Sequence, residues 1–476
     1  MRKLTFVVIL VAIVLLITPP LLGMRAHDQL LESVARGTQQ AGGRVEMELQ
    51  DYQRGWFSSH GRIHITPGEA YVNSITQDIR VAHGPLITGD SISLGLAELV
   101  ATLDAHSHPQ IAQLLQENGN PYLARATVKL GFTGLGDIRL DAPPFQYRDA
   151  VSTATSVVFA GGSALGELDV DDMRIVLQGE INGFSVTADD GEFVLEELLF
   201  DMDMHYPESD PYGLGSGHIA IASAVALSET NGSAEIRDAA MEFSSSKDSA
   251  EMVSADVTYS ADTLSGGDVE LSDLQLTLSM RNLNGQALAQ LQALNVNPSD
   301  PGMDSTQLIP SLAEPFYDLL ASGPELSISP AQFRYAGQSV KASLHVTTAV
   351  QKLPARNAFD ITNPLLYASL FDIEADLALH KELAMQAAIP TLKAQLAAGV
   401  PAGAEVDQAQ LENMAQAQAP MLLGTLLGQG MITEEGDNYR VRATYSGGEL
   451  RVNDIPLPLG ALLGAGLTGP EPQHGQ

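Results

Sequence analysis

The stretch "MRIVLQGEINGFSVTADDGEF", residues 173–193, alternates apolar and polar side chains and is punctuated by Asn-Gly and Asp-Asp-Gly. Alternation with a period of two is typical of β-strands that bury one face and expose the other, whereas Gly, Asn and Asp favour turns. The same pattern recurs in "ARATVKLGFTG", "SGHIAIASAVAL", "DLQLTLSMRNLNG", "VKASLHVTTAV" and other segments. The sequence therefore predicts consecutive antiparallel hairpins that build large amphipathic β-sheets.

Helical periodicity is confined to a few segments. We expect helices at about 94–116, 284–294, 307–322 and 381–427, the last one broken near Pro401. A helical hairpin in the last segment, which is rich in Ala, Gln and Leu, could cover one end or one face of a sheet. The predicted fold class is mainly β, of the α+β type, with a few covering helices.

The composition predicts a folded protein of more than one domain. The chain has 476 residues, of which 45% are hydrophobic and 17% are charged, enough for two or three packed domains. The best linker is "NVNPSDPGMDS", residues 295–305, which contains two prolines. It would separate a mainly-β region, 44–294, from an α+β region, 306–476.

Charge and missing motifs exclude several functions. A net charge of −33 opposes binding to nucleic acid, and the absence of cysteine excludes disulfides, thiolate catalysis and iron-sulfur clusters. The chain has no P-loop, no H-E-x-x-H and no G-x-S-x-G elbow. A G-x-G-x-x-G pattern at Gly464, Gly466 and Gly469 has no room for the helix that would follow it. We therefore expect no enzyme activity and no cofactor or metal.

The first segment predicts a membrane anchor. Arg2 and Lys3 are followed by an uncharged run from Leu4 to Met24, which is long enough to span the hydrocarbon core of a bilayer as a helix. The basic residues before it predict a cytoplasmic N-terminus and a periplasmic bulk, in a single-pass inner-membrane protein. Residues 25–43 then show Leu30, Leu31 and Val34 on one helical face and predict a juxtamembrane helix.

The stretch "YQRGWFSSHGRIHI", residues 52–65, resembles a functional site because it holds the only tryptophan and two histidines. Arg54-Gly55 predicts a chain reversal, after which Phe57, Ile63 and Ile65 would share one strand face and His60 and His64 the other. The two histidines could ligate a metal, or they could be surface residues of a hairpin. Trp56, beside Arg54, could stack on a ligand, but core packing or anchoring is the preferred interpretation.

Two further polar groups are candidates for chemistry. In "FDMDMHYPESDP" the side chains of Asp201, Asp203 and His205 would lie on one strand face and could contribute ligands to a divalent cation. Because same-face residues are about 6.6 Å apart along a strand, a tight site would need additional ligands, so a solvated face is the simpler interpretation. His106 and His108 form a similar pair that lacks an identifiable third ligand.

Several blocks resemble the YdgA-like family of bacterial inner-membrane proteins, a domain of unknown function. The blocks are "YQRGWFSS", "AHGPL", "LTLSMRNLNG", "GPELSISPAQFRYAGQSVKASLHV" and "ATYSGGELRVNDIPLPL". The residues that carry the resemblance in the first, second and last blocks are Tyr52, Arg54, Gly55, Phe57, Ser58, Ser59, His83, Gly84, Pro85, Gly448, Val452 and Asn453. The resemblance implies an anchored protein of the Gram-negative envelope that could form a homo-oligomer. It implies no reaction, and the turn chemistry of these blocks favours a structural role.

Three functional hypotheses follow. Many amphipathic strands and few helices leave a wide apolar sheet face that must close on itself, dimerise or form an open groove. An open groove predicts the binding of lipid or of another envelope component. The alternative is an assembly module that binds envelope proteins or itself, and a third hypothesis is a hydrolase that uses Asp201, Asp203 and His205.

Overall fold

The computed structural model describes residues 31, 34, 38, 45–67, 74–88, 92–148, 155–206, 212–230, 232–249, 251–267, 269–293, 305–398 and 408–457. The chain divides into two compact units. The first comprises Met1–Asp238 and Gln292–Met303, and the second comprises Ala239–Leu291 and Asp304–Gln476. The linker predicted at 295–305 lies almost entirely outside the described residues, so the predicted domain boundaries stay a prediction.

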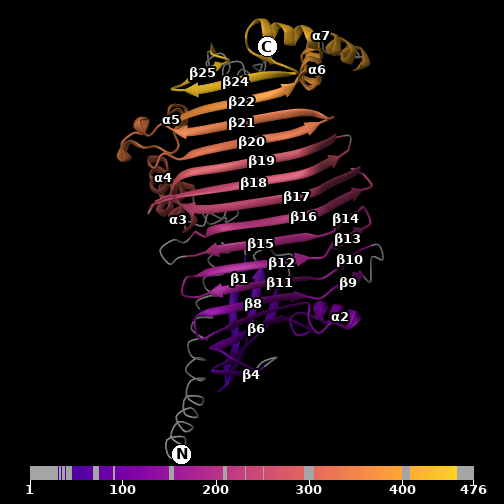
Figure 1. The fold of residues 1–476 in the computed structure, drawn as a ribbon, viewed down its shortest axis with the longest axis vertical. Helices are drawn as coiled ribbons and strands as arrows, with labels where there is room; N and C mark the ends of the chain where they lie inside the picture. Colours follow the sequence, from indigo (N-terminus) through magenta and orange to yellow (C-terminus); the bar gives the residue numbers. More distant parts are fainter. Residues whose placement is uncertain are drawn as a thin grey trace, which may run out of the picture. The chain divides into compact units, whose positions relative to one another are not determined.

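The first unit is an antiparallel sheet in which the order of the paired strands follows the chain (Figure 1). One series of paired strands is β1 (Val45–Arg54), β2 (Ser58–Pro67), β3 (Ile75–His83), β6 (Ala97–Leu103), β7 (Ala124–Leu130), β8 (Leu135–Ala142), β11 (Gly162–Asp169), β12 (Arg174–Ile181), β15 (Leu198–His205) and β16 (Leu214–Ser228). A small hairpin of β4 (Leu86–Thr88) and β5 (Ile92–Leu94) stands apart. The predicted mainly-β, antiparallel fold is therefore confirmed.

A crease, by which we mean a line of short breaks in neighbouring strands, crosses this sheet. Beyond it lie β9 (Phe145–Arg148), β10 (Ser156–Phe159), β13 (Phe184–Ala188) and β14 (Gly191–Leu195), which continue β8, β11, β12 and β15 after short breaks and pair among themselves and with β16. The register is unchanged across the crease, because Gly162 faces Ile181 on one side and Phe159 faces Phe184 on the other.

The crease corrects one prediction from the opening stretch. Asp189 and Asp190 form the predicted hairpin turn between β13 and β14, but Asn182-Gly183 does not reverse the chain. Asn182 instead donates to the carbonyl of Gly161 at 2.9 Å, and the chain runs on from β12 into β13. Gly161 and Gly183 have φ of 97° and 149°, which glycine adopts without strain, so this Asn-Gly pair bends a long strand.

The helix predicted at 94–116 is only partly right. Residues 97–103 form β6, because their alternating pattern pairs with β3 and β7, and a helix, α2 (Pro109–Asn118), begins only after His108. The Nδ1 atom of His108 accepts the first-turn N–H of Gln110 at 3.2 Å, which is a helix-capping role. The side chain of Asn118 then bonds the N–H and C=O of Gln146, both at 2.8 Å, and so protects the outer edge of β9.

The second unit repeats the antiparallel meander with longer strands (Figure 1). Its strands are β18 (Met252–Gly266), β19 (Val269–Asn284), β20 (Glu325–Tyr335), β21 (Gln338–Thr348), β22 (Phe371–His380), β24 (Asn438–Ser446), β25 (Glu449–Val452) and β26 (Ile455–Leu457), with β23 (Thr433–Glu435) also paired to β24. The remaining strand of the chain, β17 (Gly232–Lys247), spans the boundary of the two units.

Helices occupy three places between these strands. They are α3 (Gly285–Ala293) and α4 (Ser305–Ala321) after β19; η1 (Val350–Lys352), η2 (Arg356–Ala358) and α5 (Pro364–Leu370) after β21; and α6 (Lys381–Ala398) and α7 (Gln408–Gly428) after β22. The helices predicted near 284–294, 307–322 and 381–427 are confirmed, whereas the short helices between β21 and β22 were not predicted. Ala384 of α6 and Leu423 of α7 pack with Leu379 and Val441, so the predicted helical hairpin covers one end of the sheet.

The predicted anchor, residues 4–24, lies outside the described residues. Among the residues that are described, no helix is both long enough and apolar enough to cross a membrane. Of the predicted juxtamembrane helix, Leu31, Val34 and Thr38 are described and helical. Val34 is buried, and the Thr38 hydroxyl accepts the N–H of Met47 at 3.0 Å on β1.

Candidate functional site

The first two blocks of the resemblance meet in one packed corner of the first unit. The N–H of His83 donates to the carbonyl of Phe57 at 2.8 Å, and the N–H of Gly55 donates to the carbonyl of Ser58 at 2.8 Å. The Ser59 hydroxyl lies 3.0 Å from Nε2 of His83, and both side chains are at most 1% exposed. The turn chemistry predicted for these blocks is present, but the sequence did not predict the Ser59–His83 pair, because the two residues are on different strands.

Close backbone approach explains the glycine of the second block. A Cβ atom on Gly84 would lie 1.7 Å from the carbonyl oxygen of Gly95, a separation that no side chain tolerates. Gly84 donates to the carbonyl of Leu96 at 2.8 Å, and Gly95 donates to that of Pro85 at 3.2 Å. The Gly84-Pro85 turn is therefore joined by its backbone to the segment that leads into β6.

A serine beside a histidine is the geometry of an activated nucleophile, but this pair lacks the rest of the arrangement. Neither side chain reaches the surface, and no carboxylate among the described residues orients the imidazole. Burial lowers the pKa of His83, the backbone of Trp56 opposes that shift, and the charge of Arg54 adds to it. The pair is a polar contact buried inside a core. Trp56 itself is 56% exposed, so the core-packing alternative for it is wrong, and anchoring stays a prediction.

The last block has the same structural character. Asn453 donates from its side-chain amide to the carbonyls of Gly430 and Met431, at 3.1 and 2.9 Å, and its Oδ1 accepts the N–H of Arg442 at 2.9 Å. Gly448 has a φ of 88° in the turn between β24 and β25, and Val452 pairs with Ala443. The hydrogen bonds of Asn453 therefore join the last strands of the sheet to the segment that follows α7.

The polar residues of β15 lie on one face as predicted, but each has a different environment. Asp203 accepts a hydrogen bond from Nε of Arg174 at 2.7 Å, and this bond lowers the pKa of Asp203. Asp201 lies 3.4 Å from Nδ1 of His218, whereas His205 makes no contact with either aspartate. The three side chains therefore do not converge on one point where a cation would sit.

The other histidines are also separated. His64 contacts the hydroxyl of Thr76 at 3.3 Å, and His60 faces Arg80 across the β2–β3 ladder. His106 lies 3.2 Å from Asp104, and the ligand atoms of these two residues and of Asp78 fall within 4.8 Å of one another. Asp78 is 3.4 Å from Nε of Arg62, so a cation there would compete with an ion pair.

A hollow of about 310 Å³ opens on the apolar face of the first unit, beside the crease. Small residues from three neighbouring strands line it, namely Ala124, Ala126, Ala142, Gly162 and Ala164. Larger apolar side chains, Leu140, Phe159, Ile181 and Phe200, also line it, and so does Gln77. Gln77 belongs to β3, and the β3–β6–β7 register brings it into the row of Ala124 at the start of β7.

A row of aromatic side chains lies beyond the crease. Phe145, Phe159 and Phe184 are register partners, and the row ends at Leu195. Register partners share a face, so these side chains form one row, and Phe159 of this row also lines the hollow. The rings of Phe145 and Phe159 are 5.3 Å apart. In the next row Tyr147 and Phe193 are each 39% exposed, so this part of the face is open.

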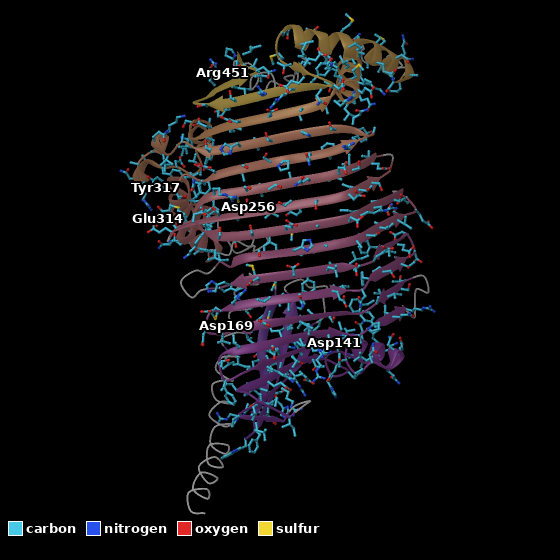
Figure 2. The ribbon with its side chains drawn as sticks, viewed as in Figure 1. Asp141, Asp169, Asp256, Glu314, Tyr317 and Arg451 are labelled. Carbon is cyan, nitrogen blue, oxygen red and sulfur yellow. The ribbon has the colours of Figure 1, made fainter. Side chains whose placement is uncertain are left out.

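The opposite face carries a charged groove of about 860 Å³. Side chains alternate along β8, so Leu140 lines the hollow while Arg139 lines the groove. Arg125 and Lys129 contribute two more cations from β7. The carboxylates are Asp137, Asp141 and Glu167, and Asp141 is labelled in Figure 2.

The second unit has its own open apolar face. Tyr259, Leu276, Ala331, Ala342, Leu377 and Val441 form one row across β18 to β24. Tyr259 is 48% exposed, and Leu276 and Leu377 are each 40% exposed. Ion pairs cross the other face: Asp256, labelled in Figure 2, accepts two hydrogen bonds from Nη2 of Arg281, at 2.7 and 3.0 Å.

Comparisons with known proteins identify a family and no activity. A comparison with curated proteins finds no match, and a comparison with solved structures finds none either. A family model described as "Bacterial protein of unknown function (DUF945)" matches residues 1–460. That match covers nearly the whole chain, including the packed corner, both open faces and the closing block. The protein therefore belongs to the DUF945 family of bacterial proteins of unknown function.

Proposed function

We propose that this protein binds acyl chains of lipids on the apolar face of its β-sheet. The hollow beside the crease is the single observation that carries the proposal. Small residues line it where large ones are ordinarily needed to fill a core, and four larger apolar side chains stand around them. An apolar space of this kind favours a flexible hydrocarbon chain, because each buried methylene contributes about 0.8 kcal/mol.

The openness of both sheets supports the same function. The row next to the aromatic row in the first unit and the apolar row of the second unit leave large apolar side chains 39 to 48% exposed. Contiguous apolar surface of this extent is costly in water and is typical of binding surfaces. Polar side chains and ion pairs lie on the other face of each sheet, so the amphipathic pattern distinguishes a lipid-facing side from a water-facing side.

A place in the bacterial envelope is part of the proposal. The uncharged run from Leu4 to Met24 would hold the chain in the inner membrane, where acyl chains are abundant. The periplasmic location of the sheet rests on the basic residues that precede that run. Binding of an envelope protein to the same apolar faces is the outcome that would replace this proposal.

The test is lipid copurification with the full chain. The protein would be released from bacterial membranes, washed free of bulk lipid and examined by native mass spectrometry and organic extraction. We expect bound lipid that Ala126→Asp reduces at least fivefold, because a carboxylate in the hollow opposes a hydrocarbon chain. Ala378→Asp is the control, since Ala378 lies in the second unit between Lys341 and Arg440, on the face opposite the apolar row. A protein that carries no lipid, or an equal loss in both variants, would reject the proposal.

A further inference from the structure

The hollow and the charged groove meet at one edge of the sheet. Arg125 and Asp141 line both cavities, although the cavities otherwise lie on opposite faces of β7 and β8. β7 begins at Ala124, which lines the hollow, and the next residue, Arg125, is one of the shared pair. A molecule that leaves the hollow at the start of β7 therefore reaches the groove directly.

The end of the groove beside the hollow carries two arginines, Arg125 and Arg139. Asp141 lies with them, and its register row ends at Glu180 on the rim of the hollow, whereas Lys129, Asp137 and Glu167 lie in a farther row. The hydroxyl of Tyr122 already donates to Asp141 at 2.6 Å, which disperses the charge of that carboxylate. In a chain of net charge −33 two neighbouring arginines are unusual, and the one that lacks a carboxylate partner within the described part of the chain favours an anionic group.

Arg139 is the residue best placed to hold that anion. Lys129 is paired with the buried carboxylate of Glu98 at 3.4 Å, and the guanidinium of Arg125 lies 5.9 Å from the centre of the Tyr122 ring. Arg139 is exposed to the groove, and among the described residues it makes neither a hydrogen bond nor an ion pair. A guanidinium group binds planar or tetrahedral oxyanions through two parallel hydrogen bonds.

We infer that the ligand is an anionic amphiphile, with its acyl chain in the hollow and its phosphate or carboxylate head group on Arg139. This inference rests on the proposed function and adds the chemical class of the ligand. The hollow alone does not distinguish head groups, because apolar contacts are not directional. The groove supplies the distinction, since it offers an unpaired arginine within reach of the rim that the two cavities share.

The experiment uses the full chain in isolated bacterial membranes. Four photoactivatable C16 probes carry the same diazirine in the chain and end in a phosphate, a carboxylate, an alcohol or a trimethylammonium group. After illumination, mass spectrometry measures labelling of the residues that line the hollow. We expect the two anionic probes to label the hollow at least fivefold more than the trimethylammonium probe.

Arg139→Gln should bring that ratio close to one and leave labelling by the alcohol unchanged. The control is Arg148→Gln, which removes an exposed arginine of β9 that lines neither cavity. Equal labelling by all four probes in the unmodified protein would overturn the inference and leave acyl-chain binding intact. No labelling by any probe would reject both. Loss of the anion preference when millimolar inorganic phosphate is added would also overturn it, because the groove would then be a site for free phosphate.

Discussion

The packed corner around Ser59 and His83 and the open sheet around the hollow are built from the same alternating strands, yet they differ in what covers them. In the corner both faces are enclosed: Ile79, Val81 and Ala82 are each 3% exposed although they belong to one strand. Beyond the crease one face remains open and aromatic. The difference shows that the residues of the family resemblance mark the place where the fold is most constrained, whereas the proposed binding face has no motif.

Physical chemistry accounts for this division. A buried side-chain hydrogen bond, or a close backbone contact such as the one at Gly84, permits one residue type only. Such positions therefore appear in the sequence as recognisable motifs. Acyl-chain binding needs apolar surface and depth, which many combinations of Ala, Gly, Leu and Phe supply. A binding face of this kind is therefore visible in a sequence only as the alternation of apolar and polar residues along each strand.

The largest effect that separates the two regions is expected for Gly84→Ala. The new methyl group would overlap the carbonyl of Gly95, so we expect the corner to lose more than about 3 kcal/mol of stability. The only tryptophan, Trp56, lies in the same corner, and its fluorescence during urea unfolding measures the loss. Gly424→Ala, in a helix with open space around it, should leave the unfolding midpoint unchanged or raise it. Similar behaviour of the two variants would contradict the close approach at Gly84.

Ser59→Ala should have the next largest effect. It leaves the buried Nε2 atom of His83 without a partner, which costs about 1–3 kcal/mol. The neighbouring Ser58→Ala is the matched control, because Ser58 points to the other face of β2, and it should cost less than about 0.5 kcal/mol. Both values come from urea unfolding followed by Trp56 fluorescence, and equal costs would show that the Ser59–His83 contact does not stabilise the corner.

The corner should also lose stability in mild acid. Burial lowers the pKa of His83 from 6.5, so the unfolded chain takes up a proton more readily than the folded one. The contribution of His83 to the free energy of unfolding is then complete above about pH 7. It decreases as the pH drops below the pKa of His83 in the unfolded chain. The urea midpoint at pH 8 and pH 5.5 measures this loss. His83→Gln should show a smaller loss than the unmodified protein, and an unchanged pH dependence in that variant would contradict a neutral, buried imidazole.

The smallest effect on stability is expected on the open face. Leu276→Ala should cost no more than about 1 kcal/mol, because the leucine is already 40% exposed. Leu320→Ala in the same unit removes a side chain that is 3% exposed and should cost about 2–5 kcal/mol. Hydrogen exchange of the amides of the second unit compares the two variants. A large cost at Leu276 would mean that the apolar row is an ordinary packed core.

Much of the fold could be predicted from the sequence, because alternation and helical periodicity are local signals. Strands such as β12 and β24 and the hairpin of α6 and α7 follow directly from them. The crease could not be predicted, since Asn182-Gly183 has the sequence of a turn and only its pairing with Ala160 and Gly161 keeps the strand in line. The sequence of β6 predicts a helix, because Leu, Ala and Glu favour helices in the absence of neighbouring strands.

The candidate site was less predictable than the fold. Alternation predicted a wide apolar face, but Ala126, Ala164 and Phe159 become one hollow only through the pairing and the crease. Arg139 and Arg125 are single basic residues with no motif around them. In contrast, the conspicuous Asp201, Asp203 and His205 have separate environments in the folded sheet, because same-face spacing along a strand keeps them apart.

The most direct test of acyl-chain binding compares two adjacent residues of β15. A photoreactive benzoylphenylalanine is introduced at Phe200, which lines the hollow, or at Leu199, which is 41% exposed on the opposite face. The full chain is expressed in bacteria whose lipids carry a radioactive acyl label, and the cells are illuminated. The proposed function predicts labelled lipid crosslinked to the protein from position 200 and little or none from position 199. Equal crosslinking from both positions, or protein crosslinks alone from position 200, would contradict it.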